Sequence, residues 1–291
     1  MDSLIEKAKT LLEALPYIQK FRGKTFIIKY GGSFMNSPDT SVRDGVARDI
    51  VFLETVGINP VVVHGGGKAI SQAMKKAGLP SEFVQGMRIT DNESALLVEQ
   101  VLSKEINPQI VQTINRLGGE AMGFSGTEIF TCRKHYVHTA EKGKIDVGFV
   151  GDVVHVNTAP LLDCIDRNIT PVISPTARGE DGEIYNCNAD VSAAKCAISL
   201  DAKRLVFMSD VPGLLRNPDD LNSLIPHVQT DEVDRLKNDG IVGKGMIPKI
   251  DSAVEAVKSG VAKVSLVDGR VPHAVMLEIF TDEGVGTELV Y

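Results

Sequence analysis

The chain has 291 residues, of which 43% are hydrophobic and 24% charged, so it can bury the core of one large α/β domain or of two lobes. A formal net charge of −7 argues against nucleic acid or an anionic membrane as the main partner. The four cysteines are scattered, and the sequence shows neither a signal-peptide pattern nor a long apolar run. We therefore expect a cytoplasmic protein without disulfides, a zinc site or a membrane span.

The first predicted element is an amphipathic helix over residues 2–21, which Pro16 should kink or divide. Leu4, Leu11 and Leu15 are among the apolar residues that fall on one side of it. The helix precedes the first strand of the domain. It either projects and buries its apolar stripe in another subunit, or packs on its own domain.

Two predicted strands end in glycine clusters. The first runs from Phe26 through Lys29 to Gly31-Gly32, and the second runs from Pro60 through His64 to Gly65-Gly66-Gly67, where a helix follows. Glycines without a Cβ let backbone N–H groups approach an anion, and a helix start adds positive potential. The first cluster equally fits an ordinary turn with a surface lysine, and His64 fits a structural hydrogen-bonding role. Neither cluster matches the P-loop or the dinucleotide fingerprint.

The middle of the chain mixes short strands with a long helix. Residues 80–92 predict a short hairpin or lid that carries Arg88 between apolar neighbours. This arginine either offers its planar fork to a carboxylate or forms a solvated salt bridge. A helix is expected over 92–117 with an interruption at Pro108, followed by β segments at 121–124, 129–133 and 147–156.

A helix over 158–168 and a buried strand over 170–174 lead to a predicted loop, 175–185, which we take as the boundary between two lobes. The expected division is a helical arm over 1–22, an N-terminal lobe over 23–175 and a C-terminal lobe over 176–291. After the loop, Asn186, Asn188 and Asp190 come together just before an alanine-rich helix. Such residues cap helices, but three of them exceed what capping needs, which favours a site.

The last third begins with a strand from Arg204 that ends at Ser209-Asp210, before an apolar loop, 211–216, able to wrap a base. Pro248 opens a further helix and places Lys249 near the positive end of that helix, where a cation is mildly disfavoured. Such a local conflict is typical of functional residues. Strands and helices alternate along the chain, which predicts a mainly parallel sheet covered on both faces.

Phosphoryl transfer needs positioning and cations around the moving charge. Lys29 and Lys249 could flank a phosphoryl group from two sides, each with an attraction on the order of 4 kcal/mol at about 4 Å. Asp190 could hold both ammonium groups in place. The sequence shows no paired carboxylates, Ser/His/Asp set or metal-ligand cluster with a competing spacing.

Five motifs in order resemble those of the amino acid kinase family over nearly the whole chain. They are Ile27-Ile28-Lys29-Tyr30-Gly31-Gly32, Val62-Val63-His64-Gly65-Gly66-Gly67, Asn186-x-Asn188-x-Asp190, Ser209-Asp210-Val211-x-Gly213 and Gly245-Met246-Ile247-x-Lys249. The resemblance implies an α/β fold, a three-layer αβα sandwich around a central, mainly parallel open sheet. The segment from Gly86 to Asp91 resembles the branch that transfers the ATP γ-phosphoryl group to the γ-carboxylate of N-acetyl-L-glutamate. The implied product is N-acetyl-L-glutamyl 5-phosphate, an acyl phosphate in arginine biosynthesis.

The resemblance also assigns roles to single residues. Lys29 and Lys249 match the lysines that stabilise the transition state, and Asp190 matches the acid that organises them. The positions that match contacts of acetylglutamate are Gly66, Gly67, Arg88 and Asn186, with Asn188 beside the reacting groups. The positions that match nucleotide contacts are Gly32, Ser209, Asp210, Val211, Pro212, Gly213, Leu214 and Leu215. Magnesium is expected to be held by ATP phosphates and water, with no protein ligand.

The N-terminal helix and the segment 278–287 resemble the arginine-inhibited branch of this family. Tyr17, Glu278 and Gly284 match its site for L-arginine, and its helices interlace dimers into a hexamer, a trimer of dimers. Ser265 stands where some arginine-sensitive relatives carry histidine, which leaves the strength of inhibition open. Some relatives also bind the nitrogen-signalling PII protein, and this sequence does not decide whether that applies here.

Two alternatives remain at this point. The chain could be another amino acid kinase, acting on carrier-bound aminoadipate, glutamate or carbamate, although the segment around Arg88 disfavours this. It could also be a non-catalytic amino-acid sensor, like the degenerate kinase-like domain attached to some acetyltransferases. The presence of both lysines and of Asp190 argues against a sensor.

Overall fold

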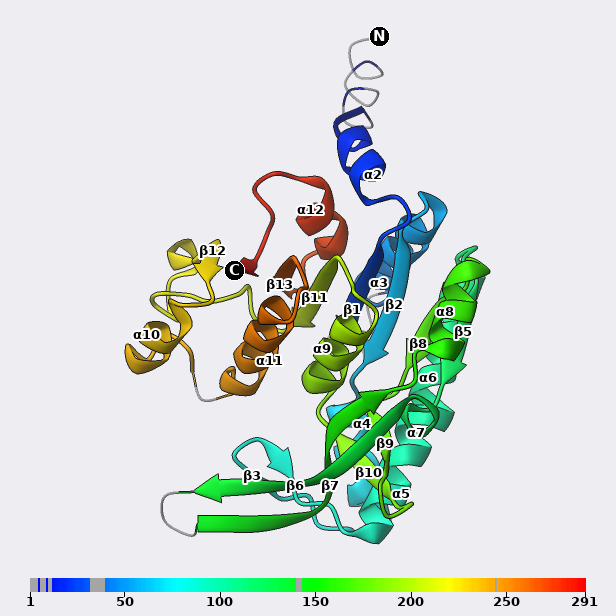
Figure 1. Ribbon diagram of the computed structural model, residues 1–291, viewed down its shortest axis with the longest axis vertical. Coiled ribbons are helices and arrows are strands. Elements are labelled where there is room, and N and C mark those ends of the chain that lie inside the picture. The colour runs from blue at the N-terminus through cyan, green and yellow to red at the C-terminus, as the bar shows by residue number, and fades with distance from the viewer. Residues whose placement is uncertain (1–4, 6–8, 10–11, 32–39, 140–142, 244) are drawn as a thin grey trace.

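A computed structural model describes residues 5, 9, 12–31, 40–139, 143–243 and 245–291 (Figure 1). Its centre is an eight-stranded sheet in the order β12-β14-β13-β11-β1-β2-β8-β5. Neighbouring strands are parallel except β13 and β14. The strands are β1 (Thr25–Tyr30), β2 (Asn59–His64), β5 (Ala121–Phe124), β8 (Thr170–Ile173), β11 (Arg204–Ser209), β12 (His227–Gln229), β13 (Lys263–Asp268) and β14 (Thr287–Val290). The predicted mainly parallel sheet is confirmed.

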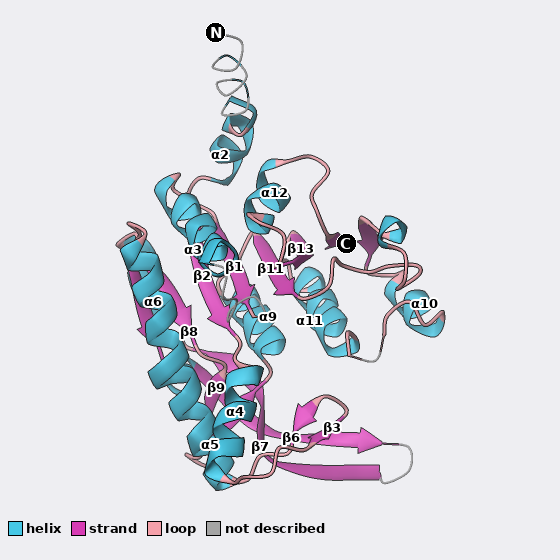
Figure 2. Cartoon of the chain, turned by 180° about the vertical axis from the view of Figure 1, so that it is seen from behind, coloured by secondary structure: helices cyan, strands magenta, loops and turns pink. Residues whose placement is uncertain are grey.

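Helices cover both faces of this sheet, because its central strands are apolar on both sides. Within β1, Ile27 packs into the core on one face, together with residues of α9 (Ala189–Ser199) and α11 (Ile247–Lys258). Its neighbour Ile28 packs into the core on the other face, with α3 (Thr40–Thr55), α6 (Asn107–Arg116) and α12 (Ala274–Phe280). Figures 1 and 2 show these two helical layers. The predicted three-layer sandwich is confirmed.

A second sheet lies at one end of the molecule and is built on a long hairpin, β6 (Phe130–Thr139) and β7 (Gly143–Val156). It also contains β9 (Thr176–Gly179) and β10 (Ile184–Cys187), which pair antiparallel. The prediction of a loop over 175–185 was therefore wrong. The glycines and aspartate there mark only the turn between two short strands, each too brief to show alternation.

The elements nearest the site are short or irregular. The predicted hairpin around Arg88 is present as β3 (Phe83–Val84) and β4 (Met87–Arg88). The predicted long helix consists of α5 (Asn92–Glu99), a π-helical segment (Gln100–Ile106) and α6. The irregularity lies one turn before Pro108, because a proline lacks an N–H and its ring crowds the carbonyl four residues earlier.

The described part of the N-terminal helix packs at one end of the core (Figure 1). Its longest described part is α2 (Leu15–Phe21), with Pro16 in the first turn. Ala14 is a turn residue between α2 and the helical residues before it, which agrees with the predicted division near Pro16. Ile5, Lys9, Leu12 and Glu13 are also helical, and the rest of the predicted helix lies outside the described residues. The other elements are α4 (Gly67–Ala77), α7 (Gly126–Ile129), α8 (Ala159–Asp166), a short 3-10 turn (Leu221–Ser223) and α10 (Val233–Asn238).

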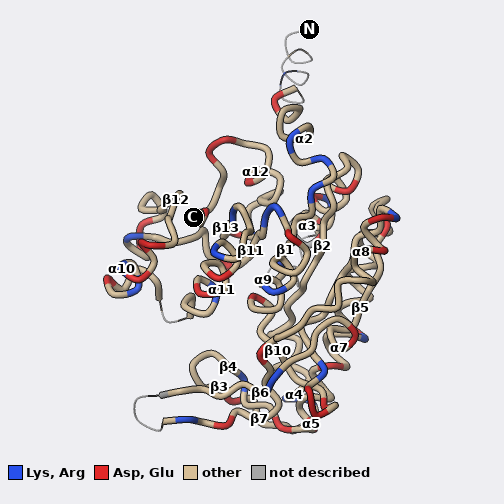
Figure 3. Tube along the Cα trace, in the orientation of Figure 1, with Lys and Arg blue, Asp and Glu red and all other residues tan. Residues whose placement is uncertain are grey.

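The main sheet is continuous across the predicted lobe boundary, since β1 pairs with β2 on one side and β11 on the other. The division into lobes stays a prediction. Acidic and basic residues are interspersed along the chain (Figure 3). Among the described helices, none is both long and apolar enough to cross a membrane.

Candidate active site

The carboxyl ends of β1, β2 and β11 meet at one edge of the sheet, where open parallel sheets bind ligands. The two predicted glycine clusters touch there: the N–H of Gly65 donates to the carbonyl of Tyr30 at 2.7 Å. A Cβ on Gly31 would stand 2.8 Å from Lys29 Nζ, so a side chain there would have to displace the lysine ammonium. Gly32 lies outside the described residues.

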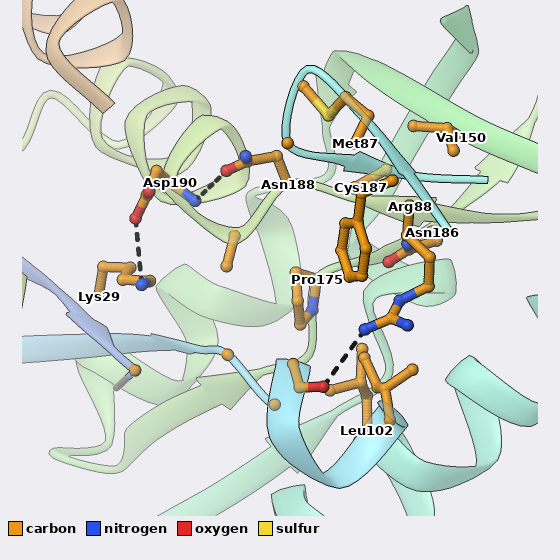
Figure 4. A pocket seen from close by; sticks show the side chains of 18 residues that line it. Lys29, Met87, Arg88, Leu102, Val150, Pro175, Asn186, Cys187, Asn188 and Asp190 are labelled. Atoms are coloured by element: carbon orange, nitrogen blue, oxygen red, sulfur yellow. Dashed lines mark hydrogen bonds and ion pairs between the residues drawn. The ribbon is translucent and has the colours of Figure 1, made fainter. Parts of the chain in front are cut away.

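A cavity of about 280 Å³ opens at this edge (Figure 4). Its size suits a small metabolite, since pockets for drug-sized ligands begin at about 300 Å³. Its lining includes all five residues predicted to bind the substrate and two predicted to act in transfer. They are Gly66, Gly67, Arg88, Asn186, Asn188, Lys29 and Asp190.

Lys29 and Lys249 both form ion pairs with Asp190, although 220 residues separate the two lysines in the sequence. Lys29 Nζ lies 3.2 Å from Asp190 Oδ1, and Lys249 Nζ lies 2.8 Å from Asp190 Oδ2. Figure 4 shows the first pair at the side of the cavity. The three groups come from β1, α9 and α11, and their side chains are only 10–15% exposed. The predicted juxtaposition of these groups is therefore present.

Burial by itself would raise the pKa of Asp190, but the charges of Lys29 and Lys249 outweigh it and lower the pKa to about 2. Burial lowers the pKa of Lys249, and Asp190 partly restores it. Asp190 is thus a fixed anion at neutral pH. Lys249 lies in the first turn of α11 with its ammonium 4.9 Å from the centroid of the Phe207 ring. The aromatic ring and Asp190 therefore compensate for the unfavourable helix end.

Arg88 is a further buried cation of the site, with 6% of the residue exposed. Its guanidinium donates to Ser81 Oγ, to Ser71 Oγ at 2.9 Å and to the carbonyl of Gly67 at 3.3 Å. It also stacks on Phe83, with 4.5 Å to the ring centroid. Among the described residues, no Asp or Glu forms an ion pair with Arg88. A buried guanidinium held only by neutral groups is suited to an anionic ligand.

Asn188 caps α9 with its side-chain oxygen, which accepts from the N–H groups of Asp190 at 2.8 Å and Val191 at 3.3 Å. The capping interpretation of this residue is therefore correct, and its amide group also lines the cavity. Asn186 lies in β10 on the same wall. The N-terminal turns of α4 and α9 both border the cavity and favour negative charge in it.

Sequence reasoning missed the apolar part of the wall, in particular Phe83 and Leu102. Leu102 lies in the π-helical segment and packs against Gly66. A Cβ on Gly66 would come 2.5 Å from the Cδ2 atom of Leu102. No motif marks these residues. Only the proline six positions after Leu102 signals the irregular turn.

The predicted nucleotide loop follows β11, at the same edge of the sheet. The hydroxyl of Ser209 donates to the carbonyl of Val211 at 3.2 Å, and Gly213 has a φ of +144° that favours glycine. Leu214 is fully buried in the core, and its N–H donates to Thr287 Oγ1. The exposed residues of the loop are Asp210 and Val211, and Pro212 and Leu215 are half-buried. Asp210 lies at the start of the loop.

The three residues predicted for the arginine site gather around α12. Glu278 is buried, and a Cβ on Gly284 would lie 2.7 Å from Glu278 Oε2. The Tyr17 hydroxyl donates to Asp282 in the same C-terminal segment, and the Tyr17 ring lies 6.4 Å from that of Phe280. The structure therefore joins the N-terminal helix to the C-terminal segment.

Across the described part of the chain, no group of three or more His, Cys, Asp or Glu side chains is placed to hold a metal ion. Asp190, the one acidic residue among the described residues that line the cavity, is already engaged by two lysines. The described residues of the site therefore offer cations and N–H groups, which suit phosphate oxygens more than a metal.

The chain is similar to known proteins over nearly its whole length. The model of the amino acid kinase family matches residues 24–268. The acetylglutamate kinases of Geobacter metallireducens and Aquifex aeolicus are 47% and 46% identical, each over 99% of this chain and 99% of theirs. That of Akkermansia muciniphila is 46% identical over 100% of this chain and 99% of its own.

Solved structures share the fold at lower identity. An N-acetylglutamate synthase from Neisseria gonorrhoeae, complexed with coenzyme A and N-acetyl-glutamate, has a TM-score of 0.83 at 23% identity; the match covers 98% of this chain and 63% of the synthase. Carbamate kinase from Giardia lamblia bound to AMP-PNP has a TM-score of 0.65 at 15% identity, covering 92% and 98% of the two chains. By sequence and fold, this chain belongs to the amino acid kinase family, and the relatives of 46–47% identity named above are acetylglutamate kinases.

Proposed function

We propose that this chain transfers the γ-phosphoryl group of ATP to the γ-carboxylate of N-acetyl-L-glutamate, forming N-acetyl-L-glutamyl 5-phosphate in arginine biosynthesis. The observation that carries the proposal is the pairing of two buried lysines with Asp190 beside a cavity that also contains Arg88. The relatives named acetylglutamate kinase, at 44–47% identity, support the choice of substrate.

Arg88 would hold a carboxylate of the substrate through its planar fork, because no described carboxylate neutralises it. Asn186 and the backbone of Gly66 and Gly67, which also line the cavity, would contact the remaining polar groups. This arrangement would leave the γ-carboxylate directed toward Lys29, at the other side of the cavity (Figure 4).

The acceptor needs no general base, since a carboxylate with an ordinary pKa near 4 is already ionised at neutral pH. One of its oxygens attacks the γ-phosphorus as the bond to the ADP oxygen breaks. Lys29 and Lys249 would stabilise the charge on the transferring group, and Asp190 would keep both ammonium groups in register. Asn188 would donate from its amide beside the reacting groups.

ATP would bind with its base against the loop Ser209–Leu215 and with its phosphates near the lysines. Gly32 would donate to the phosphoryl group. Magnesium would be carried by the phosphates and water, in keeping with a site built from cations and N–H groups. We place nucleotide binding in the lobe over 176–291, and substrate binding and dimer contacts in the lobe over 23–175.

We also propose feedback inhibition by L-arginine at Tyr17, Glu278 and Gly284. A ligand there would act on the contact between the N-terminal helix and the C-terminal segment. Ile5, Leu12 and Leu15 are exposed on that helix, which supports interlacing of dimers into a hexamer of three dimers. A PII-type signalling protein is a further candidate partner, and we place the protein in the cytoplasm.

A coupled ADP-release assay with N-acetyl-L-glutamate, with and without L-arginine, tests the proposal. We expect turnover that depends on the acetylated substrate and falls when arginine is added. Carbamate, glutamate and carrier-bound aminoadipate serve as alternative acceptors. Preference for one of these would reassign the substrate, and arginine binding without any turnover would make the chain a sensor.

A further inference from the structure

His64 is a buried histidine behind the active-site glycines, and it takes no part in the proposed transfer. It ends β2 and is fully buried, and it is not among the residues that line the cavity. Its Nδ1 lies 3.0 Å from the carbonyl oxygen of Gly65, and its Nε2 lies 3.3 Å from Asn107 Nδ2. A carbonyl can only accept and an amide nitrogen can only donate, so the hydrogen must be on Nδ1.

Asn107 is anchored in turn to the backbone of two strands. Its Nδ2 donates to the carbonyl of Val172 at 2.9 Å and, at a longer 3.4 Å, to that of Phe124. The neighbouring Gly123 makes room for it, because a Cβ there would stand 2.1 Å from Asn107 Oδ1. The amide group therefore has a single orientation that suits its surroundings, with its nitrogen toward His64.

The glycine loop is fixed on its other sides as well. Gly65 donates to the carbonyl of Tyr30, while Leu102 and Ile106 press against Gly66 from the π-helical segment. Glycines have no side chains with which to set their own conformation. The orientation of this loop must therefore come from its neighbours: His64 bonds the carbonyl of Gly65, whereas Arg88 and Ser71 bond that of Gly67.

We propose that His64 is a positioning residue: its Nδ1–H, fixed by Asn107, holds the carbonyl of Gly65 and so orients the N–H groups of Gly66 and Gly67 toward the substrate. The inference rests on the proposed function. Acid–base catalysis by His64 does not fit the geometry, because both ring nitrogens are engaged away from the cavity. Burial also lowers its pKa to about 4, which keeps the ring neutral.

Two amide substitutions at this position separate positioning from packing. In His64→Asn the side-chain nitrogen can replace Nδ1 and donate to Gly65, whereas the contact with Asn107 is lost. In His64→Gln the amide reaches the Nε2 position, and the bond to Gly65 is lost, although the larger side chain fills the site better. A positioning role and a packing role therefore predict opposite orders for the two variants.

We expect His64→Gln to raise the KM for N-acetyl-L-glutamate about tenfold with little change in kcat, as for loss of binding common to ground and transition states. His64→Asn should stay within about threefold of the wild-type KM while it lowers the melting temperature more, since it leaves more empty volume. If the variant with the lower melting temperature had the higher KM, packing would explain the effect and the proposal would be overturned. Gly123→Ala leaves His64 intact but displaces Asn107, whose donor keeps the imidazole hydrogen on Nδ1, so it should also raise the KM. His64→Asn escapes this effect, because an amide nitrogen donates without such a partner.

The tautomer gives an independent test without turnover. In nitrogen-15 spectra of wild-type protein at neutral pH, we expect the His64 ring to carry its hydrogen on Nδ1, with the signal assigned by its loss in His64→Gln. A hydrogen on Nε2 would contradict the bond to Gly65. If wild-type protein does not turn over N-acetyl-L-glutamate, the proposed function fails, and the role of His64 toward this substrate fails with it. Wild-type turnover with an unchanged KM in His64→Gln overturns the inference alone.

Discussion

The two ends of the cavity treat buried cations in opposite ways. At one end, Lys29 and Lys249 share a carboxylate supplied by the protein itself, at 3.2 and 2.8 Å. At the other, Arg88 is just as deeply placed, but its described partners are all neutral: hydroxyls, a carbonyl, the sulfur of Met74 and an aromatic ring. Both arrangements give the cations polar partners, yet only the first includes an anion, which offsets one of the two positive charges.

This difference agrees with what each end would meet in a reaction cycle. The charge near the lysines changes during phosphoryl transfer, so the protein must keep them ordered when no phosphate is present, and Asp190 does so. Arg88 would meet a carboxylate that stays charged throughout, so the substrate can act as its counter-ion. A built-in counter-ion therefore indicates chemistry, and a missing one indicates binding.

Asp190→Ala removes the carboxylate that Lys29 and Lys249 share, and we expect it to have the largest effect. It leaves two buried ammonium groups without a partner, so we expect the free energy of unfolding to fall by about 3–5 kcal/mol, together with loss of turnover. Urea titration and the ADP-release assay measure the two effects. The control is Glu255→Gln, which breaks a half-exposed pair with Lys195 and should cost under about 1 kcal/mol. Equal losses in both variants would remove the special status of Asp190.

Removing either lysine tests the chemistry at this end. Lys29→Ala and Lys249→Ala should each lower kcat by roughly 10²–10³-fold, as for loss of a preorganised donor to the transition state. The KM for N-acetyl-L-glutamate should change much less, because Arg88 is untouched. Lys195→Ala, outside the site, serves as the control. Normal turnover in either active-site variant would refute the assignment.

The sequence predicts this end of the site better than the other. Lys29, Asp190 and Lys249 each stand at a strand end or helix start, and parallel strands bring such positions to one edge. The central sheet could be predicted for the same reason, from apolar runs such as Phe26–Ile28 separated by helices. Charge and glycine are visible in a sequence, and so is the order of elements.

The apolar wall and the second sheet could not be predicted in this way. Leu102 reaches Gly66 only because the helix widens into a π-helical segment before Pro108, and no residue pattern states that geometry. Strands β9 and β10 have four residues each, which is too short to show an alternating pattern. His64 was visible, but its partner Asn107 lies 43 residues away.

Acid should affect the two ends differently, because Asp190 titrates and Arg88 does not. The pKa of Asp190 is lowered from 3.8 to about 2 in the folded protein. Its contribution, on the order of 2 kcal/mol, is therefore complete above about pH 4 and is lost as the pH falls toward 2. Unfolding free energies measured across this range should fall more steeply in wild type than in Asp190→Asn. Parallel curves would show that the two lysines do not perturb Asp190.

At the binding end, Arg88→Lys keeps the charge and removes the planar fork. We expect the KM for N-acetyl-L-glutamate to rise about tenfold at nearly constant kcat, since one charge-assisted hydrogen bond is lost equally in ground and transition states. Arg133→Lys, on the exposed hairpin, is the matched control. A fall in kcat without a change in KM would move Arg88 to the chemical step.

The smallest effect is expected on the free energy of unfolding without ligand. Arg88→Met replaces a buried, uncompensated guanidinium by an apolar chain of similar length, so we expect the free energy of unfolding to change by less than about 1 kcal/mol. In wild type, N-acetyl-L-glutamate at a hundred times its Kd should add about 2.7 kcal/mol, and this gain should vanish in the variant. Thermal unfolding with and without the ligand measures both quantities. A loss of several kcal/mol in the ligand-free variant would make Arg88 a structural residue like Asp190. Its contacts with neutral groups would then stabilise the fold without any ligand.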